Sequence, residues 1–314
     1  MRKVLVTGGA GFIGSHIVDA LVRRGDQVRV LDNLSTGNLA NLADVRDRIE
    51  FIEADLNDAD KVARAVTGVD CIFHEAALAS VPRSVERPLE TNAACVTGTL
   101  VLLDAARKAG VRRLVYAASS SAYGNQPAAS KRESDLPMPI SPYGAAKVAA
   151  EFYCQAFAAM GEIETVALRY FNVFGPRQDP NSEYSAVIPR FITLMLGGQR
   201  PTVFGDGYQS RDFTFVGDVV EGNLRAADAA NVSGRVFNIA TGHQVNLLEL
   251  LASLNRLLNT RVEPIFAPSR AGDVRESLAD ITLAREHLKY EPQVRFDEGL
   301  RRSIDYYVGL VAKR

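Results

Sequence analysis

The start of the chain constrains the fold most, because a short apolar strand there runs directly into a glycine-rich loop. Val4 to Val6 has the pattern of a buried strand, and the loop Gly8-Gly9-Ala10-Gly11-Phe12-Ile13-Gly14 leads into an amphipathic helix that extends to about Arg24. Glycines let the backbone turn tightly and approach a pyrophosphate, whose charge the helix N-terminus then stabilises. A glycine triplet alone is weak evidence, since many turns contain as many. The order of strand, loop and helix, however, is the one that dinucleotide binding requires.

A second strand, Gln27 to Leu31, ends at Asp32. An acidic side chain at this place accepts hydrogen bonds from both hydroxyls of the adenosine ribose and repels a 2′-phosphate. Asn33, Leu34 and Ser35 follow, with no arginine beside the acid, so the sequence favours NAD over NADP. A strand-end aspartate that only caps a turn is common, but the strand, loop and helix before it weigh against that interpretation.

Strand-like runs alternate with helical patterns as far as about residue 175. This alternation predicts an α/β fold, namely a Rossmann-type doubly wound parallel sheet covered by helices on both faces. Ligands of such sheets lie beyond the carboxyl ends of the strands, where Gly8, Asp32, Asp55, Ala77 and Ser119 fall. The later strands are expected at Ile49 to Ala54, Cys71 to Ala77, Leu114 to Ala118 and Val166 to Tyr170, with a helix at Thr91 to Ala109.

At 314 residues the chain is long for one core, and its pattern changes after about residue 175. Proline, glycine and aspartate become frequent there, and the elements become shorter. Val236 to Ala240 is strand-like and is expected to return to the main sheet. We therefore expect residues 1–175, with 212–242, to form the NAD-binding domain. Residues 176–211 and 243–314 would form a smaller α/β lobe that binds the substrate.

Composition narrows the partners and the compartment. A net charge of −1 gives no electrostatic case for binding nucleic acid or an anionic membrane. Cys71, Cys95 and Cys154 stand alone in apolar surroundings, which is typical of buried thiols in a reducing compartment. The run Met1 to Thr7 is too short for a signal peptide, and no stretch reaches transmembrane length. These features predict a cytoplasmic protein.

Tyr143 and Lys147 stand at positions i and i+4 in the stretch Ser141 to Lys147, so a helix places both on one face. An ammonium near the phenol favours the phenolate, and the pair is expected to bring the tyrosine pKa from about 10 towards neutrality, where it acts as a base. Lysine also has donors for a cofactor hydroxyl. Such a pair arises by chance on many surface helices, and the glycine loop is what favours the catalytic interpretation. His74 and Glu75, by contrast, are interpreted as structural, since no second histidine lies at metal-ligand spacing.

Together, Gly8-x-x-Gly11-x-x-Gly14, Asp32 and Tyr143-x-x-x-Lys147 resemble the extended short-chain dehydrogenase/reductase superfamily. Within it, the stretch Arg169 to Gly175 and the motif Arg270-x-Gly272-Asp273 resemble the nucleotide-sugar epimerases. The resemblance implies that Tyr143 is the catalytic base, that Lys147 binds the nicotinamide ribose, and that Ser119, with Ser120, hydrogen-bonds the reacting sugar hydroxyl. The predicted NAD contacts, besides Tyr143 and Lys147, are Gly8, Gly11, Phe12, Ile13, Gly14, Asp32, Asn33, Ser35, Asp55, Leu56, Ala76 and Ala77.

The same resemblance implies a site for a uridine diphosphate sugar. Asn172 and the Ala186-Val187 backbone would hold the uridine diphosphate, together with Arg211, Arg270 and Asp273, and guanidinium groups suit diphosphate oxygens. Ser80 and Ser277 are also expected to contact the substrate. In the epimerases the position of Ser277 faces the C2 substituent of the sugar, where a tyrosine admits only plain hexoses and a small residue leaves room for an N-acetyl group. Arg177 and Arg275 are interpreted as solvated surface charges.

The residues around Ser119 also bear on the reaction. Sugar dehydratases of the superfamily place Asp-Glu after the serine or threonine, and the decarboxylases place a glutamate two residues before the tyrosine that matches Tyr123. This chain has Ser120 and Ser121 at these positions. Without an added carboxyl group, elimination and decarboxylation lack their acid or base, whereas epimerisation needs none.

The expected activity is therefore NAD-dependent 4-epimerisation of a UDP-sugar. The stretches Ala79 to Ser84, Tyr116 to Ser121 and Gln178 to Asn181 resemble epimerases that act on UDP-N-acetylglucosamine. UDP-glucose and UDP-glucuronate remain alternatives, as do a non-catalytic NAD-binding sensor on the same fold and an oxidoreductase that releases reduced cofactor. The apolar faces of the two helices at about Thr91 to Ala109 and Ala145 to Met160 either cover the sheet or pair across a dimer, and the resemblance favours a homodimer.

Overall fold

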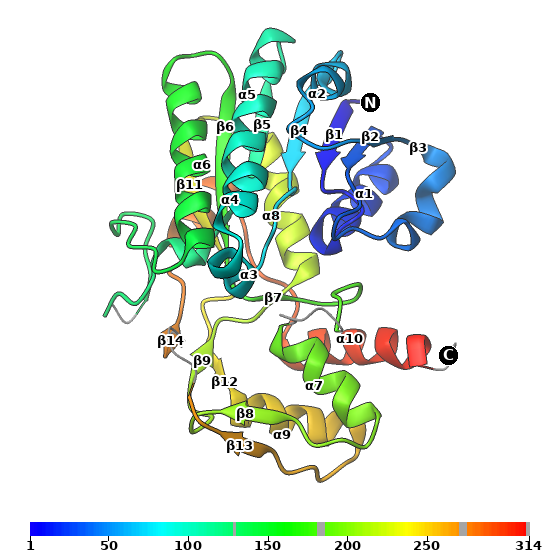
Figure 1. Ribbon diagram of the computed structural model, residues 1–314, viewed down its shortest axis with the longest axis vertical. Helices are drawn as coiled ribbons and strands as arrows, with labels where there is room; N and C mark the ends of the chain where they lie inside the picture. The colour runs from blue at the N-terminus through cyan, green and yellow to red at the C-terminus, as the bar shows by residue number, and fades with distance from the viewer. Residues whose placement is uncertain (128–129, 181–185, 270–274, 312–314) are drawn as a thin grey trace.

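A parallel sheet forms the centre of the computed structural model, which describes residues 1–127, 130–180, 186–269 and 275–311 (Figure 1). Its strands are β1 (Lys3–Thr7), β2 (Gln27–Asp32), β3 (Ile49–Glu53), β4 (Cys71–His74), β5 (Arg113–Ser119), β6 (Glu164–Tyr170) and β11 (Arg235–Ile239). The seven strands lie in the order β11-β6-β5-β4-β1-β2-β3, and every neighbouring pair is parallel. This confirms the predicted Rossmann-type, doubly wound sheet.

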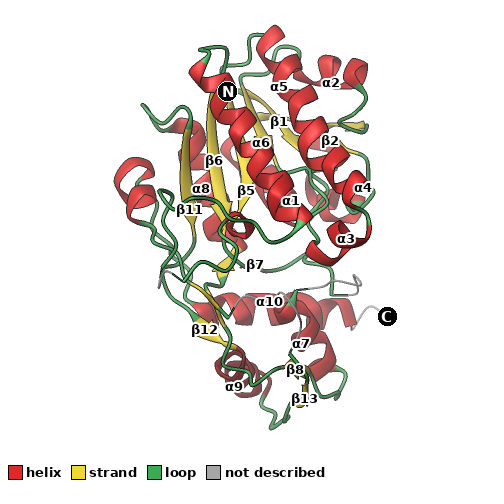
Figure 2. Cartoon of the chain, turned by 60° about the vertical axis from the view of Figure 1, so that its left-hand side comes forward, coloured by secondary structure: helices red, strands yellow, loops and turns green. Residues whose placement is uncertain are grey.

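Helices cover both faces of the sheet (Figure 2). On one face α1 (Phe12–Arg24) packs beside α8 (Val216–Asp228), and on the other lie α2 (Ala59–Val66), α5 (Gly98–Lys108) and α6 (Pro142–Ala159). Along β1, Val4 and Val6 belong to the apolar cluster under α1 and α8, whereas Leu5 belongs to the cluster under α2 and α5. Because alternate side chains of β1 enter different buried clusters, this strand is a continuous apolar run in the sequence.

The helix expected at Thr91 to Ala109 differs from a regular α-helix. It is built from α4 (Pro88–Asn92), a π-helical segment η2 (Ala93–Thr97) and α5, which follow one another without a break. Gly98 opens α5 where a Cβ atom would lie 2.9 Å from that of Leu56. The close approach of this helix to the end of the sheet therefore requires glycine.

Below the carboxyl ends of the strands lies a smaller group of elements (Figure 1). Its helices α7 (Val187–Leu196), α9 (Leu247–Leu258) and α10 (Phe296–Val311) enclose a separate core that includes the packed rings of Phe174, Phe213 and Phe296. In the domain division that we propose, these helices belong to the substrate lobe, while α8 and β11 belong to the NAD-binding domain. The short strands here are β7 (Val173–Phe174), β8 (Thr202–Phe204), β9 (Ser210–Arg211), β10 (Thr214–Phe215), β12 (Val245–Asn246), β13 (Ile265–Ala267) and β14 (Glu276–Ser277).

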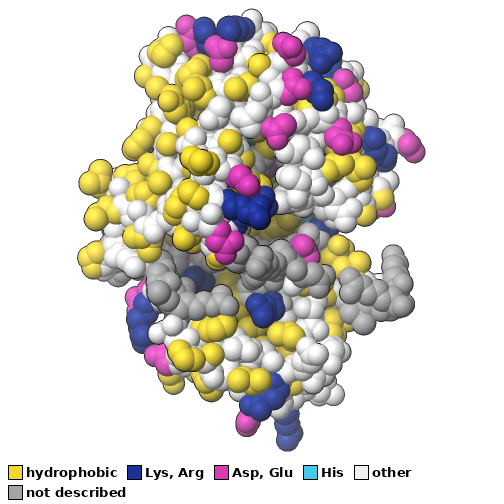
Figure 3. Space-filling model, viewed as in Figure 1, with side chains coloured by type: hydrophobic (Ala, Val, Ile, Leu, Met, Phe, Trp, Pro, Cys, Tyr) yellow, Lys and Arg dark blue, Asp and Glu magenta, His cyan; other side chains and the backbone are white. Residues whose placement is uncertain are grey.

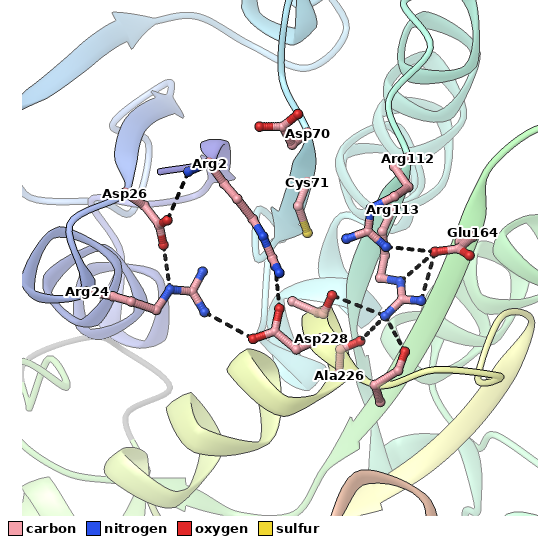
Figure 4. Close-up of polar contacts among 12 residues, drawn as sticks. Arg2, Arg24, Asp26, Asp70, Cys71, Arg112, Arg113, Glu164, Ala226 and Asp228 are labelled. Carbon is pink, nitrogen blue, oxygen red and sulfur yellow. Dashed lines mark hydrogen bonds and ion pairs between the residues drawn. The ribbon is translucent and has the colours of Figure 1, made fainter.

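An ionic network occupies the opposite, amino-terminal edge of the sheet (Figure 4). Asp228, the last residue of α8, pairs with Arg2 and Arg24. Arg113 donates to the carbonyls of Ala226, Ala227 and Ala229 and pairs with Glu164. These bonds satisfy carbonyl groups that the end of a helix leaves unpaired. The network thus anchors α8 at the edge of the sheet that lies away from the predicted site.

The remaining elements are α3 (Val81–Glu86), η1 (Leu39–Arg48), η3 (Ser120–Ala122) and η4 (Ala284–Leu288). The three cysteines are buried and free, as predicted. Acidic and basic side chains intermingle over the face drawn in Figure 3, in keeping with the small net charge. Within the described ranges, no helix has the length and apolar character needed to span a membrane.

Candidate active site

Helix α6 presents Tyr143 and Lys147 at the carboxyl end of β5. Ser141 caps the helix, since its Oγ accepts a hydrogen bond from the Gly144 amide at 3.1 Å. A Cβ atom on Gly144 would lie 2.8 Å from the carbonyl oxygen of Ser121, so glycine lets the helix start close to η3. The first turn of α6 is thereby held against the serine run that begins at Ser119.

Lys147 is almost completely buried, at 4 % exposure. Its Nζ donates to the carbonyl oxygen of Ala117 at 2.8 Å and lies 5.0 Å from the centre of the Tyr116 ring. Burial lowers the pKa of Lys147 from its ordinary value. An ammonium has three donors, so two remain for other acceptors at this edge of the sheet.

Burial raises the pKa of Tyr143 far above the ordinary value of 10, and Cys95 and Glu75 also raise it. The side chain of Ser119, which lies near the phenol, lowers this pKa. The expectation that Lys147 brings this pKa towards neutrality is therefore wrong for the chain alone. Desolvation of the phenolate dominates, and the Lys147 ammonium is directed at Ala117.

Ser119 ends β5, and its Oγ accepts a hydrogen bond from the Ser121 amide at 3.1 Å. Ser120 begins η3 directly after it, and both serines are partly exposed. In the sheet Ser119 pairs with Tyr170, so the ends of β5 and β6 lie side by side. The structure thus brings Ser119, Tyr143 and Lys147 together, and it places Ser120 next to them.

The glycine loop has no room for side chains at two positions. Gly8 has a φ of 67°, and a Cβ atom there would lie 2.7 Å from the Cα atom of Ala76. A Cβ atom on Gly14 would lie 2.2 Å from the carbonyl oxygen of Gly8. The loop therefore forms a compact turn that ends at the N-terminus of α1, where Phe12 and Ile13 form the first residues. Such a turn fits the pyrophosphate of a dinucleotide.

Asp32 lies beside this loop and is 6 % exposed. Its Oδ2 accepts a hydrogen bond from the Ala10 amide at 2.9 Å, and its Oδ1 accepts one from the Leu34 amide at 2.8 Å. Burial raises the pKa of Asp32, while these two bonds lower it. Since each carboxylate oxygen has more than one lone pair, the group can hold the loop and still accept from a ribose hydroxyl.

The other predicted cofactor residues lie at the ends of β2, β3 and β4. Asn33 donates to Asp55 Oδ2 at 2.7 Å and accepts from the Ser35 amide at 3.0 Å. The amide of Asn57 is the main cause of a lowered pKa at Asp55. Leu56 is buried beneath them, and Ala76 and Ala77 follow β4 within the reach of Gly8. Small or polar residues therefore line one continuous edge, and this arrangement suits NAD.

The predicted substrate residues are more dispersed. Ser80 caps α3 by accepting from the Arg83 amide at 3.2 Å, and Asn172 is exposed with a φ of 25°. Ala186 caps α7 and Val187 begins it, so backbone N–H groups of a helix N-terminus are available there. Arg211 and Ser277 pair directly between β9 and β14. Arg270 and Asp273 lie outside the described residues.

The two arginines interpreted as surface charges differ from each other. Arg275 is 70 % exposed in its pair with Asp206, as expected. Arg177 pairs with Asp19 of α1 at 2.8 Å, and the two side chains are only 16 % and 13 % exposed. The surface interpretation of Arg177 is therefore wrong, because this ion pair ties the segment after β7 to the first helix.

A buried ion pair that was not predicted from the sequence fixes α6 against the sheet. Arg169 on β6 donates to both carboxylate oxygens of Glu151 on α6, at 2.9 and 2.7 Å, and the side chains are 2 % and 1 % exposed. The guanidinium also lies 4.7 Å from the centre of the Tyr123 ring. The position of the helix that carries Tyr143 and Lys147 therefore depends on this pair.

His74 and Glu75 have different surroundings. His74 is fully buried between the hydroxyls of Thr7 and Thr99, at 2.7 and 2.8 Å, and burial lowers its pKa to about 3. Glu75 instead accepts a hydrogen bond from Tyr170 at 2.8 Å. Successive side chains of an extended segment point in opposite directions, so His74 and Glu75 are separated. This alternation could have shown from the sequence that the two residues do not act as a pair. Across the described part of the chain, no group of three or more His, Cys, Asp or Glu residues could hold a metal ion.

Comparisons with known proteins identify the relatives of this chain. The sequence pattern of the NAD dependent epimerase/dehydratase family matches residues 4–240. A UDP-glucose 4-epimerase of Mycolicibacterium smegmatis is 41 % identical over 97 % of this chain and 98 % of its own length.

Two solved structures have the same fold along nearly their whole length. A UDP-N-acetylglucosamine 4-epimerase of Methanobrevibacter ruminantium, in complex with UDP-N-acetylmuramic acid, has a TM-score of 0.95 and 38 % identity, covering 98 % of this chain and 99 % of that one. A UDP-glucuronic acid 4-epimerase of Bacillus cereus, in complex with UDP-glucuronic acid and NAD, has a TM-score of 0.91 and 31 % identity with the same coverage. These relatives share 4-epimerisation of a UDP-sugar in their names and differ in the sugar.

Proposed function

Since the chain belongs to the NAD dependent epimerase/dehydratase family, as an extended short-chain dehydrogenase/reductase and a UDP-sugar 4-epimerase, we propose that it interconverts UDP-N-acetylglucosamine and UDP-N-acetylgalactosamine. The predicted family, enzyme class and cofactor NAD are confirmed by the comparisons. The choice of sugar rests on one observation of this chain, the small residue Ser277 beside Arg211.

In the proposed reaction the side chains at the end of β5 bind the sugar 4-hydroxyl and transfer its proton. The phenolic oxygen of Tyr143 takes the proton of the sugar 4-hydroxyl and later returns it, while the Oγ of Ser119 holds that hydroxyl. When bound, NAD would take up the C4 hydride and return it, and its positively charged oxidised ring would favour the phenolate of Tyr143. Lys147 directs its remaining donors to the nicotinamide ribose. Inversion requires the 4-keto sugar to offer both faces, so we propose firm binding at the diphosphate and loose binding at the sugar.

Ser277 supports the N-acetylated substrate through its place in the fold. It pairs with Arg211, the candidate diphosphate ligand, and its carbonyl oxygen accepts a hydrogen bond from the Asp212 amide at 2.8 Å. This bond fixes the backbone of β14, so the size of the side chain at position 277 decides how much space remains next to Arg211. A serine there leaves room for an N-acetyl group.

The test is Ser277→Tyr, assayed with UDP-N-acetylglucosamine and with UDP-glucose. Added bulk penalises only the larger ligand, so kcat/KM for the N-acetylated sugar should fall by roughly tenfold to 200-fold relative to that for UDP-glucose. Ala252→Tyr, on the exposed side of α9, adds the same side chain away from the site and serves as the control. An unchanged ratio would show that Ser277 does not line the sugar site. A wild-type enzyme inactive on every N-acetylated sugar would refute the substrate assignment.

We also propose that two copies of the chain associate through α3, α4 and α6. These helices pack on one another and expose Leu89 at 84 %, Val85 at 64 %, Met160 at 61 % and Phe152 at 52 %. An exposed apolar face of this kind suits a twofold dimer. Light scattering should give twice the chain mass, and Leu89→Asp should reduce it to the mass of one chain. A wild-type protein with the mass of one chain would contradict the dimer.

A further inference from the structure

Glu75 lies where a dinucleotide must cross the sheet. The glycine loop follows β1 and the Tyr143 site lies at the end of β5, and the strand order places β4 between them. A cofactor that reaches from Asp32 to Tyr143 therefore passes over the residues that follow β4, the first of which is Glu75. The close contact between Gly8 and the backbone of Ala76 keeps this segment directly beside the loop.

A buried hydrogen-bond chain fixes one oxygen of the Glu75 carboxyl group. Asn223, fully buried on α8, donates from Nδ2 to the Val219 carbonyl at 2.9 Å and to the Tyr170 hydroxyl at 2.8 Å. A carbonyl only accepts, so the orientation of the Asn223 amide is set. Tyr170 must then direct its own proton to Glu75 Oε1, which it meets at 2.8 Å. This series of hydrogen bonds, which runs from α8 through β6, thus ends on the Glu75 carboxyl group.

The same carboxyl group shares its surroundings with the catalytic pair. Glu75 raises the pKa of Tyr143, and the charge of Lys147 lowers the pKa of Glu75. Hydride transfer needs the reacting carbon and the nicotinamide ring about 3–3.5 Å apart, while that carbon's hydroxyl contacts Tyr143. A nicotinamide ring that exchanges this hydride would therefore lie close to Tyr143 and within the electric field of Glu75.

We propose that Glu75 is an electrostatic partner of the bound NAD, whose carboxylate stabilises the positively charged oxidised ring over the neutral reduced ring. Tyr170 and Asn223 hold the carboxylate in place for this purpose. An epimerase must recover NAD in its oxidised form at each turnover. A fixed negative charge disfavours the state in which the enzyme keeps NADH bound. This inference rests on NAD as the cofactor and does not depend on which UDP-sugar is the substrate.

The charge of Glu75 changes within the neutral range. Burial raises its pKa to about 7, against the lowering effects of Tyr170 and Lys147. The titratable groups that face it are Tyr170 from β6 and Lys147 and Tyr143 from α6; burial raises the pKa of both tyrosines and lowers that of Lys147. The preference for oxidised NAD is therefore present above about pH 7 and lost as the pH falls below it.

The test compares Glu75→Gln with Glu53→Gln, an exposed glutamate at the end of β3 on the same edge. Each holoenzyme is equilibrated with UDP-N-acetylglucosamine and separately with UDP-glucose, then denatured, and its NADH and NAD are separated by chromatography. Two unit charges even about 12 Å apart, at an effective dielectric constant of about 20, change an equilibrium constant roughly tenfold. The NADH to NAD ratio should therefore rise about tenfold in Glu75→Gln at pH 8 and remain at the wild-type value in Glu53→Gln.

The pH dependence separates an electrostatic role from a structural one. In the wild type the ratio should rise as the pH falls through about 7, and in Glu75→Gln it should not change with pH. Tyr170→Phe keeps the carboxyl group but removes its donor, so the transition should move to higher pH, and this variant decides the matter if Glu75→Gln does not fold. A wild-type ratio in folded Glu75→Gln, or an unchanged transition in Tyr170→Phe, would overturn the inference. A wild type without any NAD would overturn it together with its premise.

Discussion

Replacing Tyr143 with phenylalanine removes one oxygen from the centre of the site. The ring stays in place, and the variant loses only the polar contact of one hydroxyl group near Ser119, which costs about 1 kcal/mol in a folded protein. The melting temperature should therefore fall by no more than a few degrees. Turnover should fall by roughly two to four powers of ten, or about 3–5 kcal/mol in activation free energy, because the variant has no base.

The pH profile gives this prediction a second, independent measurement. Burial raises the pKa of Tyr143 in the chain alone, and the phenolate is the active form, so wild-type kcat should increase with rising pH. Tyr143→Phe should lose this dependence. Tyr153→Phe, which removes the same oxygen from an exposed position of α6, is the matched control. Near-normal turnover in folded Tyr143→Phe would refute the assignment and move the role to Ser119 or Tyr123.

Three further substitutions probe the cofactor site and its support. Lys147→Met removes the donor to the nicotinamide ribose, so turnover should be at least as low as in Tyr143→Phe; normal NAD content and activity would contradict this role. Asp32→Ala removes an acceptor that holds the glycine loop, so NAD released by denaturation should fall well below one per chain, and full retention would exclude this contact. Glu151→Gln leaves Arg169 charged and buried, which should cost about 3–5 kcal/mol in urea unfolding, and a midpoint equal to wild type would show that the pair is not needed.

Local sequence patterns were sufficient to predict the fold. The apolar run at Val4 to Val6, the glycines after it and the acid at Asp32 each lie where the predicted strand, loop and strand end require. The return of β11 to the main sheet was expected from strand character at Val236 to Ala240, although the sequence did not indicate that it pairs with β6. These features depend on residues close together in the chain, and one sequence contains that information.

The interactions that the sequence did not reveal join residues far apart in the chain. The bonds from Asn223 through Tyr170 to Glu75, and the ion pair of Arg177 with Asp19, depend on which helices lie next to which strands. The prediction that the pKa of Tyr143 lies near neutrality was wrong for a related reason. Spacing on a helix places an ammonium near a phenol, but the extent of burial, which outweighs that charge, is set by the whole fold.

The most direct test of the central claim is to incubate the purified protein with a single UDP-sugar and no added NAD, and to follow the anomeric and C4 signals by NMR. UDP-N-acetylglucosamine should give UDP-N-acetylgalactosamine, and the reverse reaction should reach the same mixture, with NAD bound at about one per chain. A protein that leaves UDP-N-acetylglucosamine, UDP-glucose and UDP-glucuronate unchanged while holding NAD would contradict the account.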